Sequence, residues 1–495
     1  MTATLGSVAP FAAAAQPEPV GEQPPQGLAD AKLLEYVRDV MWPAFEAERE
    51  RLRVIDLWMK GDQADSRVPN GATKELKNLL ALSKTPWLGL VVTTIAQTLY
   101  VDGYKSPEAK GNIPGPWATW NANGMEVRQL AIHRGAVGYG YSYETVLPGI
   151  APGNVQRAVM RGVSPKRMLA VYEDPGADEW PELAMKVEPQ RGGAILVKVL
   201  DHQFVHRMLR TSDDKWTYLG LQEHGAGVCP VVRFTNMLDL EGNTPGEVEP
   251  FIPVASRIDK TEYDRLSVQH HNSWKVWTAS GMANFAESEE EANLKKLKLR
   301  MGDILIAEDP DTKFGTLDET GLKGFIDAAD ADRESLAAVA QLPSHLLTGK
   351  LVNLSAEALA AARASLTQKA YERKVSLGAA HSQALRLAAK LDGDIEAAQD
   401  VYARVTWQDV EVRSLAQAVD ALGKAAQMLG IPRQFLWSRI PGVTADDVKE
   451  WVDHALDDDP LTQYLRDFDK KNPAAGQSFG PDPTEGGALY EAPEL

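Results

Sequence analysis

The chain has 495 residues, a formal net charge of −17 and a single cysteine. Its length exceeds the roughly 250–300 residues at which one core stops growing, so we expect more than one packed unit. With Cys229 as the only cysteine, an internal disulfide and a cysteine-based zinc cluster are excluded. The acidic balance argues against a protein that grips nucleic acid by neutralising phosphates over its whole surface.

The two ends of the chain differ in composition from its body. Residues 1–28 are rich in Ala, Pro and Gln and lack the basic start and apolar core of a signal peptide, so we expect a disordered leader. Residues 457–495 are rich in Asp, Pro and Gly and are predicted to be a mobile acidic tail. We expect no membrane span in between.

Helical periodicity dominates the first part of the body. The apolar face of Ala29–Leu57 predicts a helix that Pro43 breaks or restarts. A second apolar face follows in Trp87–Tyr104, and Gly103 is predicted to end that helix. A loop with Trp117 and Trp120 and a helix over Met125–Val137 are expected next.

Between Tyr139 and Phe234 the period changes to two, which predicts an antiparallel β region. Gly138-Tyr139-Gly140-Tyr141 lacks the strand and third glycine of a nucleotide-binding loop, so we interpret it as a close-packed turn from helix to strand. The candidate strands are Tyr141–Val146, Met168–Tyr172, Ala194–Leu200, Phe204–Leu209, Trp216–Leu221 and Val231–Phe234.

Long helices return in the second half of the chain. A helix is predicted from Ile252 to an end near Trp274–Gly281, and an amphipathic helix over Phe325–Leu342 stops at Pro343. Ser355 then caps a very long Ala-rich helix that runs to Leu391. The other expected elements are a short α+β insertion (Met282–Leu322) with a strand at Ile304–Ala307, a strand at Val401–Trp407, and helices at Ala416–Met428, Arg433–Ser438 and Ala445–Leu456.

Signatures of catalysis are mostly missing from the sequence. Gly349-Lys350 is followed by Leu351 where an ATP-binding loop needs Ser or Thr, and no His-Glu-x-x-His helix or Gly-x-Ser-x-Gly elbow occurs. His224-Gly225-Ala226-Gly227 is similar to the oxyanion loop of lipases, which leaves a hydrolase using His224 as one alternative. The other interpretation is a turn shaped by its glycines. We expect no catalytic residue, no cofactor and no metal site.

One basic run stands out in this acidic chain. Lys295, Lys296, Lys298 and Arg300 follow the acidic residues of Glu287–Glu291 within the predicted insertion. Such a run either contacts a partner or forms a solvated face balanced by the neighbouring carboxylates. Both interpretations remain open on charge pattern alone.

A family resemblance gives these elements a common meaning. The stretch Ala340–Gly349, followed by Asn353-Leu354-Ser355-Ala356-Glu357-Ala358-Leu359, resembles the portal proteins of tailed double-stranded DNA bacteriophages, particularly the long-tailed siphophage type. Trp120-Asn121-Ala122-Asn123, the Gly-Val-x-Pro-Val-Val ending of His224–Val232 and the end of the long helix at Ser376–Leu387 are similar as well.

The resemblance implies an α+β portal fold, assembled as a ring of twelve subunits at one capsid vertex. It implies an α/β wing, long stem helices, a small α/β clip and an α-helical crown. Carried onto this chain, the regions are residues 29–237 (wing), 238–277 (linker and first stem helix), 278–324 (clip), 325–342 (second stem helix), 343–354 (tunnel loop), 355–391 (long helix spanning wing and crown), 392–409 (returning wing strand) and 410–456 (crown).

The resemblance also implies sites, partners and a location. Double-stranded DNA would pass the tunnel loop without sequence specificity, and the terminase large subunit and a head-tail adaptor would dock on the clip through Lys295, Lys296, Lys298 and Arg300. The major capsid protein and a scaffolding protein would contact the ring, which is made in the host cytoplasm and built into the virion. The tunnel-loop residues expected to face DNA are Ser344, His345, Thr348, Lys350 and Asn353.

The negative charge fits such a channel. Twelve copies of a chain with charge −17 would give a predominantly acidic lumen, which repels phosphates so that DNA slides instead of sticking. Two rival classes remain on sequence grounds, namely another oligomeric capsid or connector subunit and the hydrolase using His224.

Overall fold

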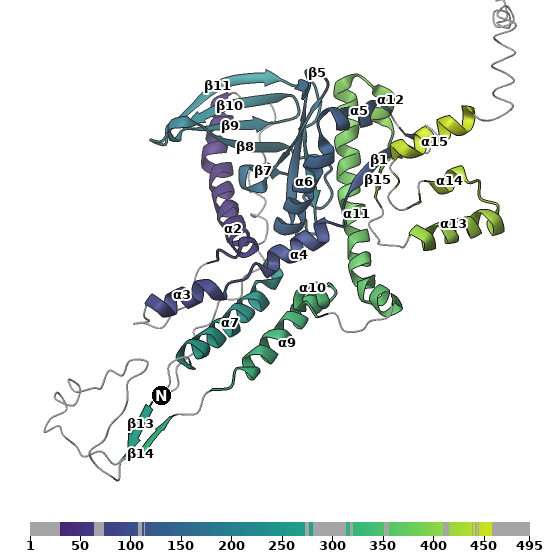
Figure 1. The fold of residues 1–495 in the computed structure, drawn as a ribbon. Helices are drawn as coiled ribbons and strands as arrows, with labels where there is room; N and C mark the ends of the chain where they lie inside the picture. The colour runs from purple at the N-terminus through teal and green to yellow at the C-terminus, as the bar shows by residue number, and fades with distance from the viewer. Residues whose placement is uncertain are drawn as a thin grey trace, which may run out of the picture. The chain divides into compact units, whose positions relative to one another are not determined.

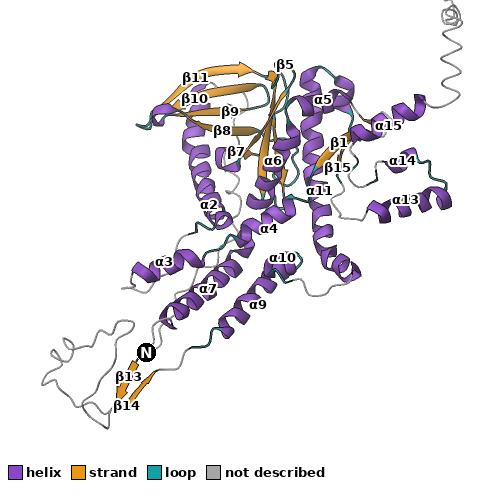
Figure 2. Cartoon of the chain, in the orientation of Figure 1, coloured by secondary structure: helices purple, strands orange, loops and turns teal. Residues whose placement is uncertain are grey.

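The computed structural model divides the chain into two compact units, residues 1–407 and 408–495 (Figure 1). The first unit contains both helices and strands, and the described part of the second unit contains helices (Figure 2). The expected leader lies outside the described residues, as does the tail beyond Asp457. The described residues are 30–63, 74–106, 111–112, 114–272, 277–280, 313–316, 320–350, 356–408, 415–437, 439–440, 443 and 445–457.

The first helical stretch continues through Pro43. Helix α1 (Asp30–Tyr36), a π-helical turn (Val37–Met41) and helix α2 (Trp42–Lys60) follow one another directly. Pro43 lies in the first turn of α2, where a missing N–H is tolerated, and the wider π turn absorbs the change in hydrogen bonding. Pro43 therefore starts a helix and does not interrupt the rod.

The helix predicted over Trp87–Tyr104 is shorter than expected. After helix α3 (Lys74–Ser83), helix α4 (Trp87–Ala96) buries its apolar face, but the chain leaves the helix at Ala96. Strand β1 (Val101–Ser106) follows, so Gly103 lies inside a strand and does not cap a helix. β1 pairs with β15 (Arg404–Trp407) about 300 residues away along the chain, a pairing that local periodicity cannot reveal.

The stretch Lys74–Ala96 is long and apolar enough to cross a membrane by length and composition. In the structure, residues 84–86 separate it into two helices. Leu88, Val91 and Ile95 of α4 are fully buried among other apolar side chains. This arrangement is that of a core helix in a folded unit.

Two helices precede the β region, where one was predicted. Trp117 and Trp120, expected in a loop, lie in helix α5 (Pro114–Ala122), and their rings stack 5.3 Å apart. Helix α6 (Met125–Tyr139) then turns into strand β3 at Gly140, whose φ is 97°. A Cβ there would lie 1.9 Å from the Thr244 carbonyl oxygen, so only glycine fits and the predicted close-packed turn is confirmed.

Antiparallel sheets form the middle of the chain, as predicted. A five-stranded sheet has the order β11-β10-β9-β8-β7, and two three-stranded sheets have the orders β12-β3-β6 and β15-β1-β2. Strands β6 (Val159–Val163) and β8 (Leu183–Pro189) were not predicted. The remaining bounds are β2 (Gly111–Asn112), β3 (Tyr141–Leu147), β4 (Ile150–Ala151), β5 (Val155–Gln156), β7 (Met168–Val171), β9 (Ile195–Leu200), β10 (Phe204–Arg210), β11 (Trp216–Glu223) and β12 (Val231–Thr235), with 3-10 turns at Pro165–Arg167, Arg191–Gly193 and Glu249–Phe251.

Apolar side chains gather into separate clusters around these sheets. One cluster joins α1 and the start of α2 to the five-stranded sheet, through residues such as Phe45 and Val197. The largest cluster joins α4, α6 and the C-terminal half of the long helix to strands β3, β6 and β12. The β12-β3-β6 sheet is therefore buried along its middle strand, and all residues of β3 from Tyr141 to Val146 are buried.

Two long helices and a hairpin follow. Helix α7 (Ile252–Asn272) and helix α9 (Lys323–Val339) pack side by side (Figure 1). β13 (Trp277–Ser280) pairs antiparallel with β14 (Lys313–Thr316). The helix end expected near Trp274–Gly281 therefore comes earlier, because Trp277–Ser280 is recruited into this hairpin. The strand predicted at Ile304–Ala307 lies outside the described residues.

The longest element of the first unit is helix α11 (Ala356–Asp392), close to the predicted span of Ser355–Leu391. Helix α12 (Ile395–Gln399) follows before β15. The second unit, described by itself, contains helices α13 (Leu415–Leu429), α14 (Gln434–Trp437) and α15 (Ala445–Asp457), which confirms the three helices predicted there. Trp437 and Trp451 pack edge to face, with ring centroids 6.1 Å apart.

Candidate channel segment

The candidate segment begins with the pair α7 and α9, which ion pairs join along their length. Ala329, Leu336 and Ala337 are the buried residues of α9. Arg257 of α7 binds Asp332 of α9 at 2.8 Å, and Arg333 of α9 binds Glu262 of α7. Because these pairs are partly exposed, each adds only about 0.2–1 kcal/mol, and burial of the alanine and leucine side chains supplies the main stabilisation.

A Schellman motif ends α9 before Pro343. The Gln341 amide donates to the Ala338 carbonyl at 3.1 Å and the Leu342 amide to the Ala337 carbonyl at 2.8 Å. Gln341 adopts φ of 57°, a left-handed conformation that normally favours glycine, and Leu342 is buried. The helix thus stops at Val339, a few residues before the predicted end at Leu342.

The predicted tunnel loop contains a one-turn helix. Residues His345–Thr348 form α10, and Gly349 ends it with φ of 67° and an amide that donates a hydrogen bond to the His345 carbonyl at 2.9 Å. The Ser344 carbonyl accepts from both the amide and the hydroxyl of Thr348, at 2.9 and 3.1 Å. The segment predicted as the tunnel loop therefore contains a helical turn in its first half, which these local hydrogen bonds stabilise.

Lys350 is held against α9. Its ammonium binds Asp330 at 2.5 Å, and Asp330 also accepts from Arg333 at 2.6 Å. The Lys350 side chain is 64% exposed while that of Asp330 is 17% exposed. Its partner raises the pKa of Lys350 and, with Arg333, lowers that of Asp330. The structure thus brings together Ser344, His345, Thr348 and Lys350, whereas Asn353, Lys295, Lys296, Lys298 and Arg300 lie outside the described residues.

A buried ionic network anchors this segment to the first unit, and sequence reasoning missed it. Glu247, 4% exposed, accepts from Lys369 at 2.6 Å and from Arg373 at 2.8 Å, both on α11. Lys369 also donates to the carbonyl of Ala340, the C-cap residue of α9, at 2.9 Å. Burial opposes ionisation of Glu247, but the two cations outweigh it and hold its pKa below the usual value.

The network therefore forms one junction of three elements. Glu247 precedes the turn into α7, Ala340 ends α9, and Lys369 and Arg373 lie one turn apart on α11. We call these four residues the junction. The only sequence signal for it was a pair of cations spaced i, i+4 in an otherwise Ala-rich helix, which also fits a solvated face.

Two further groups are buried in the core beside α11. His133 of α6 and His381 of α11 are fully buried, with their Nε2 atoms 2.8 Å apart, and His133 Nδ1 lies 3.1 Å from the Leu99 carbonyl. The rings of Trp120, Phe234 and Trp407 surround the pair. Burial lowers the pKa of His133 to about 4 and holds that of His381 well below its ordinary value, so both are neutral at pH 7.

Glu144 on β3 is a second isolated polar group. It is fully buried, and neither carboxylate oxygen has a hydrogen-bond partner among the described residues. Burial raises its pKa to about 8, so the carboxyl is mostly protonated at pH 7. The residue opposite it on β6 is Gly162, which leaves room for the side chain but offers no charge.

His224 has a structural role. Its Nε2 lies 3.1 Å from the Asp201 carbonyl, and its Nδ1 accepts from the Ala226 amide at 3.2 Å. Both ring nitrogens are thus occupied by backbone groups, and the side chain is only 4% exposed. A general base needs a free nitrogen within reach of a nucleophile, so this geometry contradicts the hydrolase alternative.

Comparisons with known proteins identify the family of the chain. Residues 38–460 match the family model described as phage portal protein, SPP1 Gp6-like. The portal protein of Mycobacterium phage D29 is 25% identical over 404 residues, covering 78% of this chain and 81% of that protein. The portal protein of Mycobacterium phage L5 is 24% identical over 412 residues, covering 81% and 84%.

Among solved structures, a chain from the virion of a native gene transfer agent particle aligns with a TM-score of 0.36 at 12% identity. The alignment covers 77% of this chain and 99% of that chain, and a score this low carries no conclusion about the fold.

The family match spans most of the chain, and it settles the class of protein as a structural component of a phage virion without enzymatic activity. The chain belongs to the SPP1 Gp6-like family of phage portal proteins. The sequence-based expectations of a portal protein and a non-enzyme are thereby confirmed.

Proposed function

We propose that this chain forms a ring-shaped channel at one capsid vertex, through which DNA is packaged, retained and ejected. Twelve subunits are expected, with residues 29–237 as wing, α7 and α9 as stem, residues 278–324 as clip and residues 410–456 as crown. Family membership supports the portal role. The ring, its subunit number and these regional assignments are proposals about how the portal works.

The junction is the observation that carries this proposal. Lys369 ties the end of α9 to the long helix, and Glu247 ties the start of α7 to the same point. Both proposed stem helices are therefore fixed to α11 within a few ångströms of each other. A channel that experiences force from moving DNA needs its wall joined to the body at such a point.

The segment after α9 is proposed to face the DNA through Ser344, His345, Thr348, Lys350 and Asn353. Asp330 neutralises Lys350. A cation already paired to a carboxylate attracts phosphate less than a free one, which suits DNA that slides past. The net charge of −17 in each subunit supports the same view of a lumen that repels DNA.

Docking of partners is proposed for the clip. Terminase large subunit and head-tail adaptor would bind there, with Lys295, Lys296, Lys298 and Arg300 meeting acidic surfaces. The major capsid protein and a scaffolding protein would contact the ring elsewhere. Charge reversal at these four positions should weaken capture of the purified partners in a pull-down while ring formation continues.

Three experiments test the channel. Negative-stain images of the purified full chain should show rings with a central hole, and a particle that stays monomeric under all assembly conditions would contradict the proposal. Deletion of Thr348–Val352 should block DNA packaging or genome retention while rings still form. Normal packaging by the deletion variant would remove the tunnel-loop assignment.

Lys350→Gln should change packaging velocity more than Lys215→Gln does. Lys215 is the matched control, because it is an exposed lysine in the turn after β10.

A further inference from the structure

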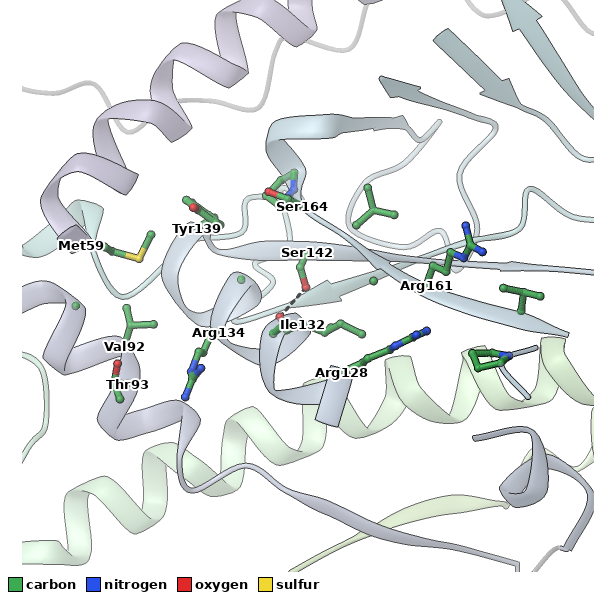
Figure 3. A pocket seen from close by; sticks show the side chains of 18 residues that line it. Met59, Val92, Thr93, Arg128, Ile132, Arg134, Tyr139, Ser142, Arg161 and Ser164 are labelled. Atoms are coloured by element: carbon green, nitrogen blue, oxygen red, sulfur yellow. Dashed lines mark hydrogen bonds between the residues drawn. The ribbon is translucent and has the colours of Figure 1, made fainter. Parts of the chain in front are cut away.

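An open groove of about 830 Å³ lies beside the edge strand of the β12-β3-β6 sheet. Its apolar floor includes Val92 and Ile132, and the guanidinium groups of Arg128, Arg134 and Arg161 stand at its walls (Figure 3). Arg128 and Arg134 extend from α6 and Arg161 from β6. We call this feature the arginine groove.

The three arginines of the groove are exposed and uncompensated. No Asp or Glu lines the groove among the described residues. None of the three guanidinium groups forms an ion pair within the described part of the chain, although most buried and many exposed cations of this acidic protein do. Three cations on an apolar floor fit an acidic protein segment better than a bare phosphate chain, because the floor also offers apolar contact.

The complementary charge lies on a loop of the five-stranded sheet that contacts β12, the opposite edge strand of the β12-β3-β6 sheet. The loop between β7 and β8 presents Glu173, Asp174, Asp178 and Glu182, none of which forms an ion pair with a described cation. Burial and the neighbouring carboxylates Glu173 and Asp178 raise the pKa of Glu182. We call this segment, residues 173–182, the acidic loop.

The acidic loop is held in a fixed shape. The Asp174 side chain accepts from the amides of Gly176 and Ala177 at 2.9 and 3.2 Å. Arg233 of β12 donates to the Pro175 carbonyl at 2.6 Å, and Gln383 of α11 donates to the Glu179 carbonyl at 2.7 Å. A loop that is ordered before binding loses little conformational entropy when it docks.

The positions of the two features decide what they bind. Arg161 lies on β6 and Arg233, which holds the acidic loop, lies on β12, and β3 separates these strands. Within the described part of the chain, none of the three arginines forms an ion pair with a carboxylate of the acidic loop. The two patches can meet head to tail between copies, which is the heterologous contact that generates rings.

We propose that the acidic loop of one subunit docks in the arginine groove of its neighbour and sets the contact between wings. This inference rests on the proposed ring. The groove thus takes a second copy of this chain, through ion pairs between its three arginines and the four carboxylates Glu173, Asp174, Asp178 and Glu182 of the loop. Contacts of this kind direct partner orientation and weaken with salt.

Charge reversal and its compensation test the proposal with the full chain. Arg128→Glu/Arg134→Glu/Arg161→Glu should raise the protein concentration for half-maximal ring assembly about tenfold or more at physiological salt, by native mass spectrometry and negative stain. Glu173→Lys/Asp178→Lys/Glu182→Lys should do the same, and mixing the two variants should restore alternating rings. Arg191→Glu/Arg207→Glu, which reverses two exposed arginines of the five-stranded sheet, serves as the matched control and should assemble normally.

A second measurement does not depend on the stability of these variants. Arg134→Cys/Asp178→Cys treated with a short bis-maleimide should give a ladder of covalent multimers, whereas each single variant should not. The native Cys229 is 1% exposed and stays unlabelled.

Several results would overturn the inference. If the groove-reversed variant forms rings as well as the wild type does, this contact is removed and the proposed ring is left intact. A missing ladder of cross-linked multimers would have the same meaning. Rings unaffected by groove reversal together with lost binding of duplex DNA would make the groove a phosphate site. Loss of assembly on deleting residues 458–495 but not on reversing the acidic loop would assign the groove to the tail. A wild-type chain that never forms rings would end both proposals.

Discussion

Replacing Glu247 by Gln should destabilise the first unit more than any surface charge change. The substitution keeps the shape of the side chain but leaves Lys369 without a carboxylate and Arg373 with only the exposed Glu372, although the two cationic side chains are 6% and 3% exposed. Removing one partner of a buried ionic group costs about 3–5 kcal/mol, because the remaining charge stays desolvated. We expect about 3 kcal/mol, since the Gln oxygen can still accept one hydrogen bond.

The assay is urea unfolding of the full chain followed by tryptophan fluorescence. Glu372→Gln is the matched control, because Glu372 pairs with the same arginine at 3.5 Å but is 61% exposed. That pair should contribute less than about 1 kcal/mol. The double variant Glu247→Gln/Lys369→Met should lose less than the sum of the two single variants, because it removes one of the stranded charges.

The pH dependence of this effect has a defined sign. The pKa of Glu247 lies below its ordinary value of 4.5 in the folded chain, so its contribution is complete above pH 4.5 and is lost as the pH falls through the folded value. The difference in unfolding free energy between wild type and Glu247→Gln should therefore shrink only below pH 4.5. Equal destabilisation by Glu247→Gln and Glu372→Gln would refute the reasoning about burial.

Three other predictions concern buried groups and a strained turn. The pKa of His133 is about 4 in the folded chain and 6.5 in the unfolded chain, so its contribution to the free energy of unfolding should fall by about 2 kcal/mol between pH 6.5 and pH 5. In urea titrations, His133→Gln should therefore reduce the dependence of the unfolding free energy on pH in this range. Glu144→Gln should stabilise increasingly from pH 4.5 to 8, by about 3 kcal/mol at pH 7, because the folded pKa is about 8; parallel curves would contradict this. Gln341→Gly should add about 1 kcal/mol in thermal unfolding by relieving the positive φ, with Gln341→Ala as a control that gives no gain.

Local patterns predicted the elements that local forces build. The apolar face of α4, the period-two strands such as β9 and β12, and the length of α11 all follow from side-chain spacing within a few turns. Wrong boundaries arose where a distant partner decided the outcome. Gly103 belongs to a strand because β15 pairs with β1, and β6 was missed because Gly162 and Arg161 break its alternation.

The candidate site was predicted only in part for the same reason. Pro343 and Gly349 punctuate the chain and mark the segment between α9 and α11, so its place was visible in the sequence. The junction was not, because Glu247 lies 122 residues from Lys369 and each residue alone fits a solvated surface. The Asp330 carboxylate that holds Lys350 was hidden in the same way among other acidic residues of an exposed helix.

The exposure pattern along α11 has a mechanical consequence. None of the residues from Ala361 to Gln368 is buried, whereas most residues from Lys369 onward are embedded in the core. Ser365 Oγ donates to the Gln341 carbonyl at 3.2 Å and Leu366 packs against the core, so at 1.5 Å per residue the helix from Ala356 to Ser365 extends about 14 Å beyond these contacts. The N-terminal part of α11 can therefore bend under load, while the embedded part keeps the sheets that it packs against in register.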